Sequence, residues 1–148
     1  MLTQKDVVVA LAGFSAALCM VAMAETRPGI MHSAAFAWTA APDKPTDVGS
    51  RRSYFKAPTA TLNELEYHAT TLKPGLASHP PHRHPNEELV IVKEGTVEAL
   101  VNGKWERLGA GAVIFNASNE LHALRNVGDT PATYHVINWQ SPPPAATK

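Results

Sequence analysis

The sequence predicts an all-β protein, either a sandwich or a barrel, for the part of the chain that follows residue 24. Short apolar segments recur at regular intervals, and residues that favour turns separate them. The dipeptide Asn102-Gly103, the strongest short signal for a β-hairpin, lies between two of these segments. No convincing helical pattern follows residue 24. The 148 residues are enough for one domain with a single hydrophobic core.

The first 24 residues are predicted to form a signal peptide. Lys5 precedes an apolar run that extends to Val21, and residues 22–24, Ala-Met-Ala, have the pattern that signal peptidase recognises. Cleavage after Ala24 would give a periplasmic or secreted protein without stable membrane association. The alternatives are an uncleaved membrane anchor and a buried core helix, since Asp6 weakens the positive charge ahead of the run.

Residues 25–58 are predicted to form an extended arm, of which residues 25–50 are expected to be largely loop. Its first half is rich in Ala, Pro, Asp and Thr, and Phe36 and Trp38 are the only large aromatic residues there. We expect these two rings to hold the arm against the barrel or against a neighbouring subunit. Residues 51–55 are a candidate for a short first strand.

Residues 59–140 are predicted to form the barrel, and residues 141–148 a disordered proline-rich tail. Strands are expected at residues 62–72, 89–92, 96–101, 104–108, 113–115, 121–125 and 133–139. Pro74-Gly75 and residues 127–130 supply turns between them. Residues 89–92, Leu-Val-Ile-Val, are apolar on both faces, which is typical of a strand that is covered on both sides.

Charge and cysteine content exclude several classes of protein. The formal net charge is zero, so nothing indicates nucleic acid or an anionic membrane surface as a partner. The single cysteine, Cys19, lies in the predicted signal peptide. The mature chain would therefore contain no disulfide and no thiolate metal ligand.

Four residues in two short segments are predicted to bind one divalent transition metal ion. The first segment contains His82, His84 and Glu88, and the second contains His122. Alternate side chains of an extended strand share a face, so the first three could point to the same side. An isolated His-x-His pair would more often be two exposed histidines, but a carboxylate in register and a distant fourth ligand favour a metal site. Fe or Mn is favoured for such ligands, and Zn, Ni or Cu is an alternative.

The spacing of these residues resembles the two sequence motifs of the cupin superfamily. His82, His84, Glu88 and Gly95 match the first motif, His-x-His, three residues, Glu, six residues, Gly, at every position. Gly111, His122 and Asn126 fit the spacing of the second motif without insertion or deletion. Ala117 replaces the proline of this motif, and Asn119 replaces a glycine. The second replacement is mild because Asn tolerates the left-handed backbone of a tight turn.

The resemblance implies a small single-domain metal-binding cupin of type 2. Its fold would be a double-stranded β-helix, the jelly-roll barrel, with the metal held by His82, His84, Glu88 and His122. Such proteins resemble dioxygenases, isomerases and lyases that act on small organic molecules. The alternative is a non-catalytic cupin that binds a small molecule or a sugar, because neither motif places a second carboxylate or base. A metal-free structural barrel is disfavoured because all four ligand positions are intact.

Several polar residues near the motifs have no role that the sequence assigns. Arg83 and Glu87 have the opposite parity to the ligands and are expected to face away. His79 is either a loop histidine, a substitute ligand or a partner of a ligand, and Glu120 is either exposed or a pocket acid. The predicted strands carry four more candidates, in each case either core, interface or site residues: Tyr67, His68, Tyr134 and His135.

A homodimer is predicted from the faces of residues 88–92. Residues that share the parity of the ligands, Glu88, Val90 and Val92, are expected to point inward. Leu89 and Ile91 on the other face are as apolar as Val90 and Val92. Only a second subunit or the protein's own arm can cover them. Cupins usually pair by packing their sheets together, so the resemblance also favours the dimer.

Overall fold

The computed structural model describes residues 29–142, and every structural statement below concerns these residues. The signal peptide predicted for residues 1–24 lies outside them, as does most of the tail predicted for residues 141–148. In the described part of the chain, no helix is long and apolar enough to cross a lipid bilayer.

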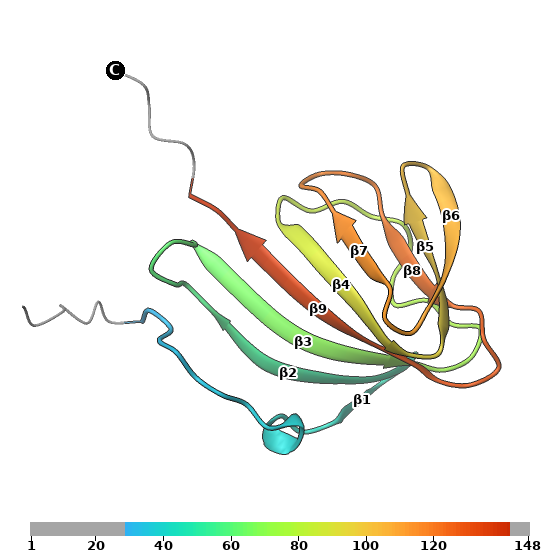
Figure 1. Ribbon diagram of the computed structural model, residues 1–148, viewed down its shortest axis with the longest axis horizontal. Coiled ribbons are helices and arrows are strands. Elements are labelled where there is room, and N and C mark those ends of the chain that lie inside the picture. The colour runs from blue at the N-terminus through green and yellow to red at the C-terminus, as the bar shows by residue number, and fades with distance from the viewer. Residues whose placement is uncertain (1–28, 143–148) are drawn as a thin grey trace, which may run out of the picture.

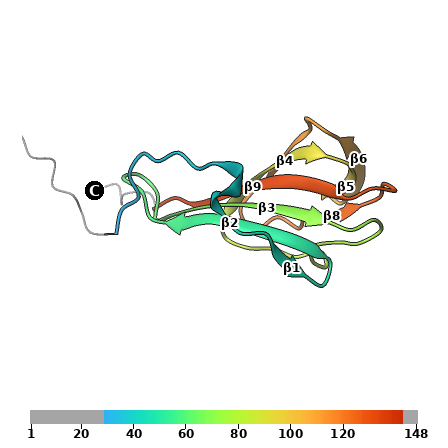
Figure 2. The ribbon, with the colours of Figure 1, turned by 90° about the horizontal axis from the view of Figure 1, so that it is seen from below.

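The fold consists of two antiparallel β-sheets that pack against each other (Figures 1 and 2). The described elements are, in chain order, the 3-10 turn η1 (Trp38–Ala40) and the strands β1 (Lys44–Thr46), β2 (Gly49–Ala57), β3 (Glu64–Leu72), β4 (Glu87–Glu94), β5 (Thr96–Val101), β6 (Lys104–Gly109), β7 (Val113–Asn116), β8 (Ala123–Asn126) and β9 (Ala132–Gln140). The larger sheet has the order β1-β2-β3-β9-β4-β7, and the smaller one β6-β5-β8. This architecture confirms the predicted all-β jelly-roll class.

The hydrophobic core lies between the two sheets. Side chains alternate between the faces of a strand, so every second residue of the inner strands points inward. Leu72 and Val92 of the larger sheet and Val97 of the smaller one are fully buried members of this core. Further along the same strands, polar residues such as His68 and Glu88 take the inward positions and line a cavity. The interior is therefore divided into an apolar core and a polar cavity.

The hairpin predicted at Asn102-Gly103 joins β5 and β6. Both residues have positive φ angles, 51° and 76°, as a two-residue hairpin turn of this kind requires. Val101 and Lys104, on either side of the turn, are paired in the ladder. The prediction from the dipeptide is confirmed.

The arm predicted at residues 25–58 contains more strand than expected, because strands already begin within residues 25–50, the part predicted to be largely loop. Residues 44–46 form β1, and residues 49–57 form β2, which is longer than the strand expected at residues 51–55. β2 pairs with β3 over most of its length, with an irregularity between Ser53 and Phe55. Its polar and charged residues obscured this strand: Arg51 lines a polar cavity, whereas Arg52 pairs with Asp43.

The first half of the arm lies against the outer face of the larger sheet. Phe36 packs on Phe55, with ring centroids 5.4 Å apart, and Trp38 packs edge-on against His135 at 5.8 Å. The ammonium group of Lys93 lies 4.0 Å from the centroid of the Trp38 ring. The structure thus places both aromatic residues of the arm on the protein's own sheet, over strands β2 and β9.

Gly95 is the one residue between β4 and β5 and permits a sharp reversal there. Its φ angle is 87°, which favours glycine. A Cβ atom at this position would also lie 2.6 Å from Ala132, too close for any side chain. The glycine of the first motif is therefore explained by the approach of β9 and not by the metal site.

Candidate metal centre

The two motif segments are joined by a backbone bridge between His82 and His122. The amide of His82 donates to the carbonyl of His122 at 3.0 Å, and the reciprocal bond is 3.1 Å long. Residues facing each other across such a pair project their side chains to the same side of the sheet. The bridge therefore brings two histidines that are far apart in sequence to one place.

The parity argument for the first motif is wrong in its detail. Residues 83–86 do not form a strand, and β4 begins only at Glu87. A loop carries His84, and the carbonyl of this residue accepts a hydrogen bond from the amide of Asn119 at 2.8 Å. Asn119 has a φ angle of 60°, the left-handed conformation expected from its place in the second motif. The convergence of the histidines thus arises from contacts between the two loops.

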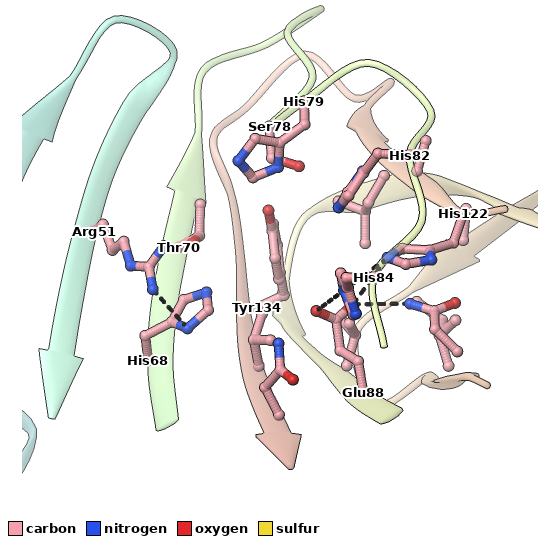
Figure 3. A pocket seen from close by; sticks show the side chains of 18 of the residues that line it. Arg51, His68, Thr70, Ser78, His79, His82, His84, Glu88, His122 and Tyr134 are labelled. Atoms are coloured by element: carbon pink, nitrogen blue, oxygen red, sulfur yellow. Dashed lines mark hydrogen bonds and ion pairs between the residues drawn. The ribbon is translucent and has the colours of Figure 1, made fainter. Parts of the chain in front are cut away.

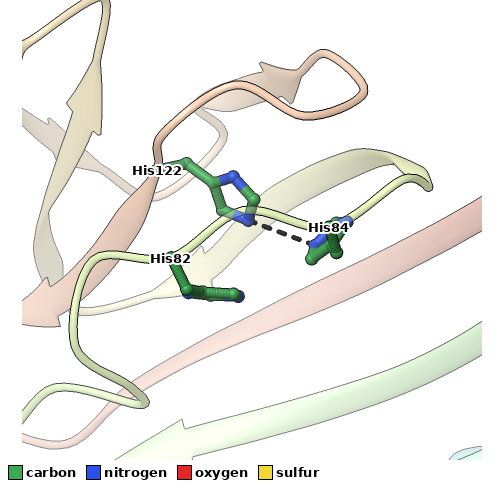
Figure 4. Close-up of side chains that lie close together, drawn as sticks. All are labelled: His82, His84 and His122. Atoms are coloured by element: carbon green, nitrogen blue, oxygen red, sulfur yellow. Dashed lines mark hydrogen bonds between the residues drawn. The ribbon is translucent and has the colours of Figure 1, made fainter.

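Three histidines form a compact cluster in the structure (Figure 4). His82, His84 and His122 each offer one ring nitrogen, and these nitrogens lie within 4.8 Å of one another. The Nε2 atoms of His84 and His122 are 3.2 Å apart. His122 is buried, and the other two are partly exposed.

The hydrogen bonds of the three rings fix which nitrogen is free. The Nδ1 atoms of His82, His84 and His122 lie 3.1, 3.0 and 2.9 Å from the backbone carbonyls of Pro80, Asn86 and Glu120, respectively. A carbonyl only accepts, so each Nδ1 must carry the hydrogen and donate it. In a neutral ring Nε2 then keeps its lone pair, which is the state that binds a metal ion.

Glu88 lies beside two of the three histidines. Its carboxylate oxygens are 3.6 Å from Nε2 of His84 and 4.0 Å from Nε2 of His122. The amide of Asn116, directly opposite on β7, donates to Oε1 of Glu88 at 2.9 Å and orients it. Asn116 was missed by the sequence reasoning, since it follows the strand predicted at residues 113–115 and occupies a position that the second motif leaves unspecified.

The cluster opens into a cavity of about 460 Å³, which is large enough for a small organic molecule (Figure 3). The apolar part of its wall includes Val90, Ile114 and Val136. The wall also contains polar residues that the sequence reasoning did not assign to the site: Thr46, Asp47, Arg51, Glu66, Thr70, Ser78, Asn116 and Asn138. The alternating polar residues of β3, at positions 64, 66, 68 and 70, are the signal that could have revealed this wall.

Burial changes the proton affinity of several cavity residues. Burial, followed by the charge of Arg51, lowers the pKa of His68 to about 4, so this ring is neutral at pH 7. Burial is also the main cause of the lowered pKa values of His79 and His122. The pKa of the Tyr134 phenol is raised, again mainly by burial, so it keeps its proton.

The remaining sequence candidates divide between the cavity and other surfaces. His68 and Tyr134 line the cavity, and so does His79, whose ring centroid is 5.2 Å from that of His82. Tyr67 and His135 lie on the outer face, joined by a hydrogen bond of 2.8 Å.

Three charged residues near the motifs lie outside the histidine cluster and make contacts elsewhere. Arg83 donates to the carbonyl of Asn119, and Glu87 accepts from the indole of Trp139. Glu120 is exposed, and its carbonyl holds the ring of His122. Arg83 and Glu120 are exposed, and Glu87 is partly buried beside Trp139.

The donors at the cluster suit a divalent transition metal ion. Three neutral imidazoles and one carboxylate would leave a net charge of about plus one on a bound divalent ion. Four protein ligands would also leave positions open for water or for a substrate on an octahedral ion.

The comparisons with known proteins agree with the fold. The family model described as the cupin domain, Cupin_2, matches residues 68–138. An RmlC-like cupin from Shewanella frigidimarina is similar, with a TM-score of 0.60 and 18% identity over 74% of this chain and 93% of that one. The polyketide cyclase RemF from Streptomyces resistomycificus is similar with a TM-score of 0.57 and 17% identity, over 76% and 83% of the two chains. At these identities the likeness concerns the fold alone, and no curated protein sequence matches the chain.

The lowered pKa of His68 predicts a loss of stability in mild acid. The folded protein keeps this ring neutral down to about pH 4, whereas the unfolded chain takes up the proton near pH 6.5. Acid therefore favours the unfolded state, and stability falls as the pH drops from 6.5 towards 4. In metal-free protein, the Tm of His68→Gln should fall less over this range than the Tm of the unsubstituted protein. Carboxylates titrate in both proteins, so the difference isolates His68, and parallel curves would contradict the assignment.

Proposed function

Residues 68–138 form a cupin domain with three clustered histidines in its cavity, and from this premise we propose that the protein is a metal-dependent enzyme that acts on a small organic molecule. The observation that carries the proposal is the orientation of the three rings, whose Nε2 lone pairs converge at the cavity. His82, His84, His122 and Glu88 would hold one divalent ion, with Fe or Mn favoured. The reaction would be of the dioxygenase, isomerase or lyase kind.

The chemistry that a bound ion supplies is polarisation of a substrate oxygen or activation of dioxygen. The other groups of the cavity would bind the substrate and move protons. His68 is neutral at pH 7 and can accept a proton, and Tyr134 keeps a proton that it can donate. Val90, Ile114 and Val136 would exclude water from the same space.

The alternative is a binding protein that holds a metal and a small molecule or a sugar without turnover. Such a protein needs shape and hydrogen bonds but no titratable groups in its cavity. The presence of His68 and Tyr134 in the wall therefore favours the enzyme. Oxygen-uptake screening of the metal-loaded protein against small phenols and diketones tests for turnover by the dioxygenase route, and product analysis by mass spectrometry tests for isomerase and lyase routes.

Removal of one histidine ligand should remove the metal. The purified protein is expected to contain one equivalent of a divalent ion, measured by inductively coupled plasma mass spectrometry. His84→Ala and His122→Ala should each lose most of it, because two lone pairs and a carboxylate remain where four donors were present. Asn116→Ala should weaken binding roughly 10- to 100-fold, because Glu88 loses the group that orients it.

His135→Ala is the matched control, since His135 lies on the outer face and contacts Trp38 and Tyr67. It should keep the full metal content. The circular dichroism spectra of all variants should match that of the unsubstituted protein, because the core residues are separate from the cluster. Full metal content in both His84→Ala and His122→Ala would refute the site.

We also propose that the protein is a homodimer, paired through the outer face of β7, β4 and β9. The arm covers the neighbouring part of this sheet, yet Val113 and Phe115 on β7 remain 60% and 52% exposed. Leu89 and Ile91, on the same face, are paired with them in the ladder. A contiguous apolar face of this kind favours association.

The dimer predicts a definite response to one substitution. Light scattering at micromolar concentration should give twice the mass of the chain, and Phe115→Glu should give a monomer because it places a charge in the apolar contact. Trp105→Glu, at a similarly exposed aromatic residue of the smaller sheet, should stay dimeric. A monomeric unsubstituted protein would overturn the proposal.

The proposal for location is export after cleavage of the signal peptide. It rests on the apolar run and the Ala-Met-Ala sequence at residues 22–24. The mass of the protein recovered from cells should correspond to a chain that begins at Glu25. A chain with an intact N-terminus in the soluble cytosolic fraction would contradict it.

A further inference from the structure

A second polar cluster lies on the wall of the cavity formed by β2, β3 and β9. Three of its residues, Arg51, Thr70 and Tyr134, form a row across the sheet. Arg51 is paired with Thr70 in one ladder, and Thr70 with Tyr134 in the next. Glu66 and His68 of β3 complete it. In the view of Figure 3, Arg51 and His68 lie on one side of Tyr134 and the three clustered histidines on the other.

Arg51 is held in a fixed orientation at this wall. Its Nη2 donates to Oε1 of Glu66 at 2.6 Å and lies 3.1 Å from Nδ1 of His68. Its Nε donates to the hydroxyl of Ser53 at 3.3 Å. Within residues 29–142, no hydrogen bond engages Nη1, so one edge of the guanidinium remains able to donate.

Arg51 is also the source of positive charge in the wall. It is the only lysine or arginine among the described residues that line the cavity, and His68 is neutral at pH 7. The negative charge of Glu66 is shared, because Lys56 lies 3.5 Å from its second oxygen. Glu66 therefore positions Arg51 but does not neutralise its charge alone, because Glu66 also pairs with Lys56.

The groups beside Arg51 can also donate hydrogen bonds. Thr70 and Tyr134 carry hydroxyls, and burial keeps the Tyr134 phenol protonated. A carboxylate accepts hydrogen bonds and carries the charge that a guanidinium binds best. The charges of Arg51 and Glu88 both act on Tyr134, and in Figure 3 this residue lies between the second cluster and the histidines.

We propose that Arg51, with the hydroxyls of Thr70 and Tyr134, is a second subsite that binds the carboxylate of a small organic acid. Another oxygen atom of the same molecule would face the histidine cluster, and the apolar wall residues Val90 and Val136 would contact the carbon chain between them. The cavity of about 460 Å³ accommodates an acid of a few carbon atoms. This identifies the substrate class of the proposed enzyme, and only the placement of the second oxygen rests on the metal site.

Calorimetric titration of the purified protein, metal-free and loaded with Mn²⁺, tests the subsite. The probes are succinate, its neutral diamide succinamide, and inorganic phosphate. Succinate should bind more tightly than succinamide to both forms of the protein. Arg51→Met should weaken succinate binding roughly 10- to 100-fold, the loss typical of a hydrogen-bonded charge. Glu66→Gln should leave succinate binding equal or tighter, because it removes the carboxylate that competes for Arg51.

The matched control is Arg107→Met, since Arg107 is an exposed arginine on β6 of the other sheet. It should bind succinate as the unsubstituted protein does. If Arg51→Met fails to fold, as judged by circular dichroism, the double variant Arg51→Met with Glu66→Gln replaces it, because it leaves no unpaired charge.

Three results would overturn the subsite: equal binding of succinate and succinamide, unchanged succinate binding by the folded Arg51 variant, or tighter Arg51-dependent binding of phosphate than of succinate. Arg51-dependent succinate binding by a protein that takes up no Mn²⁺ would support the subsite and count against the proposed enzyme. Uptake of Mn²⁺ without any preference for succinate would do the opposite.

Discussion

The antiparallel bridge between His82 and His122 is the contact on which the site depends. It is formed by backbone atoms alone, so it fixes the spacing of the two loops whatever their side chains do. A further backbone hydrogen bond, from the amide of Asn119 to the carbonyl of His84, fixes the position of His84 relative to the loop that carries His122. Two peptide contacts thus determine the positions of three rings, and the strands behind the loops determine where those contacts form.

The inner face of the larger sheet serves two purposes because its polar and apolar residues are separated along the strands. Leu72 and Val92 close the core at one end. Towards the other end, the ladder aligns Asn116, Glu88 and Asn138 across three neighbouring strands. Oδ1 of Asn138 is buried and has no hydrogen-bond partner in the described part of the chain, so this row offers an acceptor to a ligand or a water molecule. A cavity exists here because these side chains need polar partners and cannot be covered by the opposite sheet.

The sequence predicted the fold class from local patterns, and the clustering of His82, His84 and His122 from the resemblance of two segments to the cupin motifs. Turn residues and alternating apolar residues are visible in short windows, and the motif spacing determines which loops meet. The sequence failed where a residue acquires its role from a distant strand. Arg51 lies in a segment interpreted as arm, and it becomes a cavity residue only because β2 pairs with β3. Asn116 orients Glu88 only because β7 lies beside β4. Such pairings connect residues that no short window contains together.

The carbonyl that holds each clustered histidine ring belongs to a residue only two positions away in the chain. Each ring is therefore oriented by a hydrogen bond within its own loop. A loop that shifts as a unit moves the ring and its acceptor together. The acceptor that selects the tautomer thus lies in the same loop as the ring. An ion entering such a site would find rings that are already oriented, so we expect its binding to follow folding and not to drive it, in contrast to small domains that are unfolded without their metal.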